Sequence, residues 1–279
     1  MQKAICFGAG GGAIRLFEQI SKKYKIVGFT DNDSTKIRGG SINSIQIYEV
    51  NECLKLEYDK VVITSAPGLD SIKKQLDELG IEENMIDDSF VTAPLESRRV
   101  FLEKLALMQK DLDENVCVAE AGVFEGDFAK YINSYYSNRK LYLFDTFEGF
   151  NSKDIEKELN MSEAKVGDYS NTSEDLVLSK MQYKDNCRIY KGYFPDTAKG
   201  INERFCFVNL DLDLYEPTYN GLVYFEDKMI KNGVILIHDY FADNFRGPKE
   251  AVDRFISEKK GKYSALPIGD GISVMLVGF

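Results

Sequence analysis

The sequence VCVAEAGVFEGDFAKYINSYYSNRKLYLFDTFEGF, residues 116–150, contains the pattern that decides the fold. Residues 116–119 form a short apolar run typical of a buried strand, and residues 141–144 form a second one. Between them, Gly122 and Gly126 predict a turn that leads into a helix. Strand, glycine turn, helix and strand, in this order, make up the unit from which nucleotide-binding α/β sheets are built.

Acidic residues flank this turn and indicate which ligand it suits. Glu120 ends the first strand, Asp127 is placed to cap the helix, and Asp145 ends the second strand, where a carboxylate can bind ribose hydroxyls. These carboxylates would repel a pyrophosphate but tolerate a sulfonium and an amino group. The pattern favours S-adenosylmethionine (SAM) over NAD, with cofactor-binding residues Glu120, Gly122, Gly126 and Asp145. The alternative is an ordinary strand, turn and helix with solvated charges.

Composition limits the classes of protein that the chain can belong to. Its 279 residues are enough for one large or two ordinary domains, and 44% hydrophobic with 29% charged residues is a globular composition. The net charge of -10 argues against non-specific binding to nucleic acid or an anionic membrane. Cysteines without C-x-x-C spacing indicate reduced thiols, and no signal peptide or spanning apolar run is visible. We expect a cytoplasmic protein without nucleic-acid or membrane partners.

A second glycine-rich unit stands at the N-terminus. A predicted strand over residues 3–7 runs into the sequence GAGGGA, and the next predicted strand, residues 25–30, ends at Asp31. The form G-x-G-x-x-A, with an acid about 20 residues further on, is typical of dinucleotide sites. Gly8, Gly10 and Asp31 are therefore candidate residues for binding a nucleotide or nucleotide-sugar.

The pattern changes near Pro94, which disfavours helix immediately before it and predicts a domain boundary. Apolar residues at helical spacing follow from Arg98 to Leu112. We expect an α/β protein with two Rossmann-like domains, a small one over residues 1–92 and a larger one over residues 98–279. The polar segment 151–172 is either a mobile lid over a site or a solvated surface insertion.

Polar residues of the larger domain follow its predicted strands, where open α/β sheets bind ligands. Asp211 and Asp213 follow one strand, and His238 and Asp239 follow the next. Asp211 and Asp239 suit a shared divalent cation such as Mg²⁺. His238, the only histidine in the chain, is either a third ligand or a general base, since its ordinary pKa is near 6.5. The alternatives are a histidine bonded to backbone and an aspartate that caps the following helix.

Seven segments of the larger domain, in order, resemble the macrocin O-methyltransferase (TylF-like) family of SAM-dependent methyltransferases. They are VAEAGVFEGDFA, LYLFDTFEGF, KGYFPDT, LDLDLYEPT, GVILIHDYF, GPKEAVDRF and PIGDGISVML. The resemblance implies a class I methyltransferase fold, with SAM across Glu120, Gly122 and Asp145. It implies that adenine lies near the turn formed by Gly192, Tyr193 and Phe194.

The same resemblance implies a divalent metal, held by an aspartate after the fourth strand and an Asp-Asp pair after the fifth. These positions are Asp211 and the pair His238-Asp239, so this chain has histidine where the family has its first paired aspartate. In the N-terminal domain, CFGAGGGAIRL and IVGFTDND look like the small nucleotide-binding Rossmann unit found in front of sugar-modifying enzymes. That likeness implies a nucleotide or nucleotide-sugar ligand, or else a docking or dimerisation module.

We therefore expect a SAM-dependent O-methyltransferase that acts on a sugar hydroxyl of a nucleotide-sugar, glycan precursor or glycosylated metabolite, and that forms a homo-oligomer. Its expected catalytic and metal-binding residues are Asp211, His238 and Asp239. One alternative is an NAD(P)-dependent nucleotide-sugar oxidoreductase or epimerase that uses the N-terminal glycine turn. Another is a non-catalytic nucleotide-binding protein.

Overall fold

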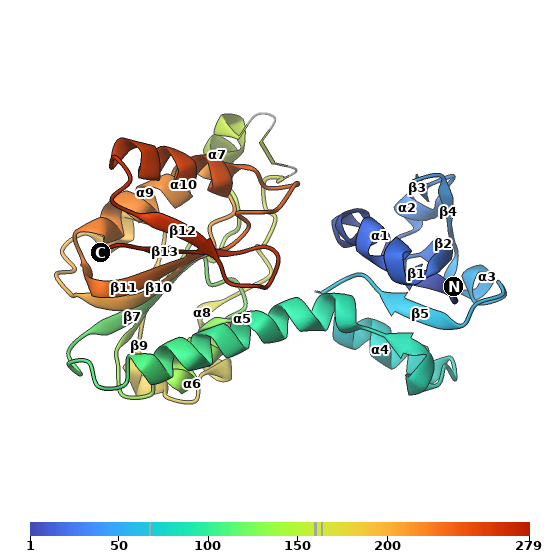
Figure 1. Cartoon of the computed structure of the whole chain (residues 1–279), viewed down its shortest axis with the longest axis horizontal. Helices are drawn as coiled ribbons and strands as arrows, with labels where there is room; N and C mark the ends of the chain where they lie inside the picture. The colour runs from blue at the N-terminus through green and yellow to red at the C-terminus, as the bar shows by residue number, and fades with distance from the viewer. Residues whose placement is uncertain (67, 159–160, 163) are drawn as a thin grey trace. The chain divides into compact units, whose positions relative to one another are not determined.

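The computed structural model describes residues 1–66, 68–158, 161–162 and 164–279. The chain divides into two compact units, Met1–Glu96 and Ser97–Phe279, and each unit has its own β-sheet covered by helices (Figure 1). Among the described residues, no helix is both long and apolar enough to cross a membrane.

The first unit contains a sheet with the strand order β3-β4-β2-β1-β5-β6, in which only β3 runs antiparallel to its neighbour. The strands are β1 (Lys3–Phe7), β2 (Lys25–Thr30), β3 (Ser41–Ile42), β4 (Ile45–Tyr48), β5 (Lys60–Ile63) and β6 (Ile86–Asp87). The helices are α1 (Gly11–Lys23), α2 (Ser34–Ile37), α3 (Val50–Cys53), α4 (Leu69–Glu78) and a 3-10 turn, Glu83–Met85. Strands are added first on one side of β1 and then on the other, so the glycine turn after β1 lies at the switch point.

The second unit contains a sheet with the strand order β12-β13-β11-β10-β7-β8-β9. The strands are β7 (Cys117–Ala121), β8 (Leu141–Asp145), β9 (Cys187–Lys191), β10 (Phe205–Leu210), β11 (Met229–Ile237), β12 (Ser264–Pro267) and β13 (Val274–Val277). Strands β7 to β11 are parallel, and β13 pairs antiparallel with both β11 and β12, which confirms the predicted antiparallel edge pair. The carboxyl ends of the parallel strands therefore meet at one edge of the sheet.

Helices cover both faces of this second sheet, so its central strands are buried on both sides and read as continuous apolar runs. Helices α9 (Tyr215–Glu226) and α10 (Gly247–Glu258) pack on one face (Figure 1). Helices α5 (Ser89–Met108), α6 (Ala129–Tyr135) and α8 (Glu174–Lys180) pack on the other. Helix α7 (Ser152–Lys157) and the 3-10 turns Lys184–Asn186 and Asp196–Ala198 lie in the connections.

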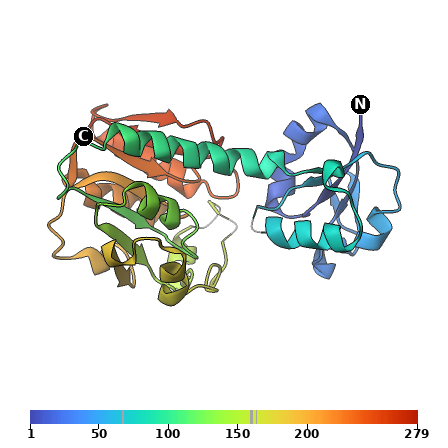
Figure 2. The same ribbon diagram turned by 90° about the horizontal axis from the view of Figure 1, so that it is seen from below.

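Two local predictions are wrong. The sequence predicted no helix immediately before Pro94, but helix α5 begins at Ser89, contains Pro94 and continues as one ribbon (Figure 2). Pro94 lies near the N-terminal end of the helix, where its missing N–H removes a single backbone hydrogen bond. Asp127 does not cap the helix after the glycine turn, because α6 begins only at Ala129 and the Asp127 carboxylate instead accepts hydrogen bonds from Lys130 (2.8 Å) and Lys180 (3.1 Å).

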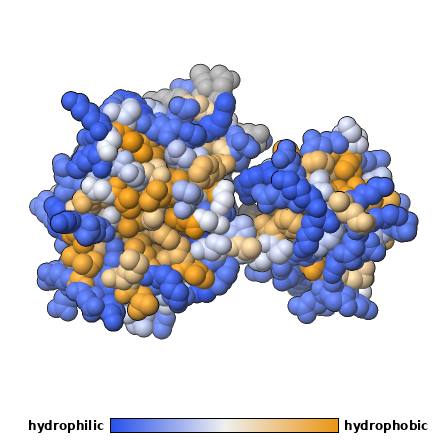
Figure 3. Space-filling view, viewed as in Figure 1, coloured by the Kyte–Doolittle hydropathy of each residue, from blue (hydrophilic) through white to orange (hydrophobic). Residues whose placement is uncertain are grey.

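Apolar side chains gather on one face of the second unit (Figure 3). On the side of the sheet that α5 covers, Ile230 of β11 and Met275 and Val277 of β13 are only partly buried. Helix coverage of the sheet is therefore incomplete at its antiparallel edge.

Candidate active site

The glycine turn after β7 contacts the end of β10 directly. Gly122 has a φ of +82°, and a Cβ at this position would overlap the carbonyl oxygen of Asp211. The N–H of Asp211 donates to the carbonyl of Ala121 (2.9 Å). Only glycine fits both the backbone conformation and the close approach. The turn that the sequence assigns to the cofactor is thus fixed beside the predicted catalytic aspartate.

Asp145, at the end of β8, holds this turn in place. One of its carboxylate oxygens accepts hydrogen bonds from the N–H groups of Val123 (2.7 Å) and Phe124 (2.8 Å). The other accepts from the N–H of Phe147 (2.7 Å). A carboxylate oxygen with one donor keeps a lone pair for a ribose hydroxyl. Asp145 therefore organises the turn as well as standing where the sequence predicts a ribose ligand.

Glu120 is a buried carboxyl with one unsatisfied oxygen. Its Oε1 accepts a hydrogen bond from Asn209 Nδ2 (2.7 Å), and its Oε2 is buried and has no hydrogen-bond partner in the described chain. Burial first, and then the charge of Asp211, raise the pKa of Glu120 to about 8. A buried polar atom without a partner is costly, and an ammonium group would satisfy it.

Arg98 and Asn209 extend this contact towards Asp211, the predicted catalytic aspartate, and neither residue was predicted from the sequence as part of the site. Arg98 Nη2 donates to Asn209 Oδ1 (2.9 Å) and to Asp211 Oδ2 (3.0 Å), while the guanidinium lies 4.0 Å from the ring centroid of Phe128. Hydrogen bonds thus run without interruption from Glu120 through Asn209 and Arg98 to Asp211. A polar Asn209 within the otherwise apolar strand FCFVNL was the available signal.

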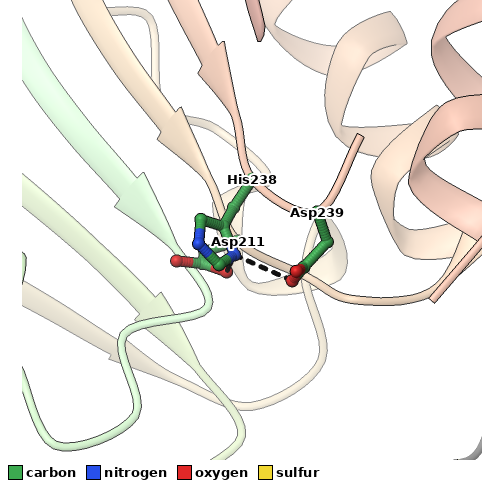
Figure 4. A group of neighbouring side chains, drawn as sticks. All are labelled: Asp211, His238 and Asp239. Atoms are coloured by element: carbon green, nitrogen blue, oxygen red, sulfur yellow. Dashed lines mark hydrogen bonds and ion pairs between the residues drawn. The ribbon is translucent and has the colours of Figure 1, made fainter. Parts of the chain in front are cut away.

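Asp211, His238 and Asp239 converge at the ends of the adjacent parallel strands β10 and β11 (Figure 4). One ligand atom of each lies within 4.8 Å of the others. His238 Nδ1 lies 2.8 Å from Asp239 Oδ2 and 3.1 Å from Asp211 Oδ1. The histidine ring is therefore held by carboxylates, in contrast to the alternative of a histidine bonded to backbone.

The charges of this cluster are tightly linked. Burial alone would lower the pKa of His238, but Asp211 and Asp239 raise it to about 10. Burial would raise the pKa of Asp211, but His238 and Arg98 outweigh it and hold that pKa well below its usual range. The two carboxylates thus favour the charged imidazole, and a divalent cation would displace the Nδ1 proton when it binds there. The role of His238 as ligand or base stays a prediction.

Asp213 is a further member of the cluster. Burial and the carboxylates of Asp239 and Asp211 raise its pKa well above the usual range. Neither Asp211 nor Asp213 caps α9, because Glu158 Oε1 accepts from the N–H of Tyr215 (2.6 Å) at the start of that helix. The cap expected of an aspartate is thus supplied by the polar segment 151–172, of which residues 159–160 and 163 lie outside the described residues.

The cluster has the donors of a cation site. The carboxylates of Asp211 and Asp239 contact the cationic groups of His238 and Arg98. Asp213 is a third carboxyl group whose pKa is raised by burial and by the charges of these two carboxylates. Carboxylate oxygens suit Mg²⁺ and Mn²⁺, and an imidazole in the set shifts the preference towards a transition metal. The residues present fit a divalent cation.

The remaining candidate cofactor residues are not all at this edge. Gly192 donates its N–H to the carbonyl of Asp145 (2.8 Å), and Tyr193 donates its hydroxyl to Asp154 (3.2 Å). Phe194 is buried in the core, with its ring centroid 5.6 Å from that of Phe225, so the structure does not present it to a ligand. Gly126 packs against α8.

The candidate residues of the first unit repeat the arrangement of the second. Asp31, at the end of β2, accepts hydrogen bonds from the N–H of Ala9 (2.7 Å) and from Lys36 Nζ (3.0 Å). A Cβ at Gly10 would lie 3.7 Å from Lys36 Nζ, and Gly8 packs against Ser65. A lysine therefore stands at the turn that precedes α1.

Comparison with known proteins gives this fold and site a class, the SAM-dependent O-methyltransferases. The family model of macrocin-O-methyltransferase (TylF) matches residues 102–268, and the chain belongs to that family. Residues 1–86 match the model of the C2185-like N-terminal domain. Membership of a methyltransferase family displaces the oxidoreductase and the non-catalytic alternatives.

Two solved structures share the fold. The O-methyltransferase NovP has 20% identity and a TM-score of 0.52, over 64% of this chain and 78% of its own. CalS11, a calicheamicin methyltransferase, has 17% identity and a TM-score of 0.55, over 76% and 93%. No curated protein matches the chain.

Proposed function

We propose that this SAM-dependent O-methyltransferase methylates a sugar hydroxyl with the assistance of a divalent cation. The acceptor belongs to a nucleotide-sugar, a glycan precursor or a glycosylated metabolite. The observation that carries the proposal is the cluster of Asp211, His238 and Asp239 beside the cofactor's glycine turn. A sugar hydroxyl is a weak acid, so its methylation needs a group that stabilises the oxygen's charge and another that takes its proton.

The proposed position of SAM follows from the match between its polar groups and the carboxylates of the site. The free Oε2 of Glu120 suits the amino group of SAM, and Asp145 suits its ribose. The backbone of Gly122 and Gly126 lines the turn, and the turn at Gly192 and Tyr193 follows β9 at the same edge. These contacts support a position of the methyl group near the end of β10.

The reaction forms a bond between the sugar oxygen and the methyl carbon while the carbon–sulfur bond breaks, and S-adenosylhomocysteine leaves. A divalent cation held by Asp211, His238 and Asp239 would supply a Lewis acid that stabilises the oxygen's negative charge. Arg98 orients Asp211. Asp213, whose pKa is raised by burial and by the carboxylates of Asp239 and Asp211, is the residue that receives the hydroxyl proton when its own carboxyl group is ionised.

The experiment is a comparison of Asp239→Ala with the wild type. The variant loses turnover, by at least about 100-fold, because the cation and His238 lose their shared partner. Its affinity for S-adenosylhomocysteine, measured by calorimetry, stays unchanged. Asp243→Ala, at an exposed aspartate of the following loop, is the matched control and keeps its activity.

EDTA treatment tests the cation separately. Activity is lost and then restored by Mg²⁺ or Mn²⁺, and the first acceptor to assay is TDP-rhamnose, the acceptor of CalS11. Full activity of Asp239→Ala in EDTA would contradict the cation site but leave methyl transfer intact. Transfer to non-sugar hydroxyls alone would contradict the sugar acceptor.

For the first unit, we infer a Rossmann-like domain that binds a nucleotide or nucleotide-sugar through Gly8, Gly10 and Asp31. Support comes from the strand order around β1 and from Lys36 at the glycine turn. The cytoplasmic location and the homo-oligomer remain predictions, and light scattering measures the second.

A further inference from the structure

The polar segment after β8 folds back onto the cofactor's turn. Phe150 donates its N–H to the carbonyl of Asp168 (3.2 Å), and Gly167 donates to the carbonyl of Phe150 (2.9 Å). Further along, Asn171 Nδ2 donates to Glu125 Oε1 (2.9 Å), and the Thr172 hydroxyl donates to the carbonyl of Phe124. The turn that contains residues 167–170 is therefore anchored beside Phe124 and Glu125 of the glycine turn.

Tyr169 stands at the tip of this turn. Its ring makes edge contacts with Phe124 (5.2 Å between centroids, 75°) and Phe150 (5.3 Å, 85°). Phe124 is in turn fixed by the hydrogen bond from its N–H to Asp145. The three rings form one aromatic cluster that belongs to the cofactor's turn.

The hydroxyl of Tyr169 is a free donor near the catalytic carboxylates. Partial burial, and then the charges of Asp213, Asp239 and Asp211, raise the pKa of this hydroxyl, so it keeps its proton. Throughout residues 1–66, 68–158, 161–162 and 164–279, no group forms a hydrogen bond with it. The side chain is 40% exposed, so a ligand can reach it.

A purely structural tyrosine accounts less well for these observations. The backbone of Tyr169 has a φ of +63°, a strained conformation for a residue with a side chain, and such strain concentrates at functional sites. Packing between Phe124 and Phe150 requires the ring but leaves the hydroxyl without a role. A sugar offers what the cluster lacks, namely an apolar ring face and neighbouring oxygens that accept hydrogen bonds.

We propose that Tyr169 binds the acceptor. Its ring, with Phe124 and Phe150, contacts one face of the sugar, and its hydroxyl donates to an oxygen next to the one that is methylated. This assignment rests on the proposed sugar O-methyltransferase function, and it makes the turn that contains residues 167–170 part of the acceptor site.

The test compares Tyr169→Phe with Tyr183→Phe, at a tyrosine of similar exposure (38%) beside the 3-10 turn Lys184–Asn186. Methyl transfer is measured at saturating SAM with TDP-rhamnose and a set of methyl pyranosides. For an acceptor that the wild type methylates, Tyr169→Phe raises KM about tenfold, the effect of one lost hydrogen bond, and changes kcat less. The affinity of Tyr169→Phe for S-adenosylhomocysteine stays at the wild-type value. Tyr183→Phe keeps the wild-type KM, kcat and S-adenosylhomocysteine affinity.

Acceptor KM values within twofold of wild type in Tyr169→Phe would overturn the assignment while the proposed function stands. A wild type that methylates no sugar in the set overturns the proposed function, and the role of Tyr169 falls with it. A second variant gives a binding readout that does not depend on the activity of Tyr169→Phe. Because the chain has no tryptophan, an introduced tryptophan is the only source of indole fluorescence. In Tyr169→Trp the acceptor changes the emission of the introduced residue, whereas in Tyr183→Trp it does not. Unchanged emission of Tyr169→Trp during turnover would also overturn the assignment.

Discussion

Glu120 is the residue whose ionisation most directly connects the fold with cofactor binding. In the free protein its pKa is raised to about 8, so it is mostly protonated at neutral pH. In the proposed contact, the amino group of SAM requires the ionised form. Binding below the raised pKa therefore releases a proton, and affinity increases as pH rises.

We predict that the dissociation constant of S-adenosylhomocysteine falls between pH 6 and 8, by up to about tenfold per unit, and levels off above pH 8. Calorimetry in buffers of different ionisation enthalpy measures the released proton. Glu120→Gln binds more weakly and loses this pH dependence. A wild-type affinity that is flat over this range would contradict the ammonium contact.

The same shift affects the stability of the ligand-free protein. Below the ordinary pKa of 4.5, Glu120 is protonated in both the folded and the unfolded state. As pH rises from there towards about 8, only the unfolded state ionises, so the wild type loses stability relative to Glu120→Gln.

Single residues were predicted from the sequence where their position after a strand was informative. Asp211, His238 and Asp239 were identified because each follows an apolar strand, and the structure brings them together. Arg98 was not, because its contact with Asp211 joins residues 113 positions apart and depends on how α5 packs. Helix capping by Asp211 or Asp213 was left open as an alternative, since nothing in the sequence shows that Glu158 reaches α9.

Among the structural elements, the turn between β7 and α6 is the one whose geometry the site depends on. Its Gly122 is constrained twice, by a positive φ and by contact with the Asp211 carbonyl, whereas Gly200 has a similar φ of +86° and no atom within 4 Å of a built Cβ. Comparison of Gly122 with Gly200 therefore separates the cost of a positive φ from the cost of the close contact with Asp211.

We predict that Gly200→Ala lowers the free energy of unfolding by about 1 kcal/mol, the cost of a left-handed alanine. Gly122→Ala costs at least about 3 kcal/mol more, because the turn must move away from β10, and it loses S-adenosylhomocysteine binding. Urea unfolding and calorimetry measure both effects. Equal losses in the two variants would show that the contact with Asp211 contributes nothing.

Strands such as β8 and β10 were predictable because each is a short, continuous apolar run of the length of a buried strand. The start of α5 was not, because a proline inside a helix is tolerated when the helix packs well on a sheet, and the sequence does not show that packing. The burial of Phe194, which was expected near adenine, was also not predictable, because it follows from the packing of its ring on Phe225.

At the scale of the whole molecule, the chain contains two glycine turns with different charged neighbours. The turn of the second unit has Glu120 near it, with an unpaired buried oxygen that suits an ammonium group. The turn of the first unit has Lys36 beside it, paired with Asp31, and the first turn of α1 contains no acidic residue. One protein is thus expected to hold two ligands of opposite charge, one in each unit.

We predict that TDP binds the first unit and does not displace S-adenosylhomocysteine, since anion and ammonium ligands select different turns. Lys36→Ala weakens TDP binding about tenfold by removing one charge and leaves S-adenosylhomocysteine binding unchanged. The matched control is Lys55→Ala, at an exposed lysine paired with Glu52 on the surface. Calorimetry with each ligand, alone and in the presence of the other, measures both affinities. Competition between the two ligands, or no TDP binding at all, would contradict a nucleotide site in the first unit and favour a docking role for it.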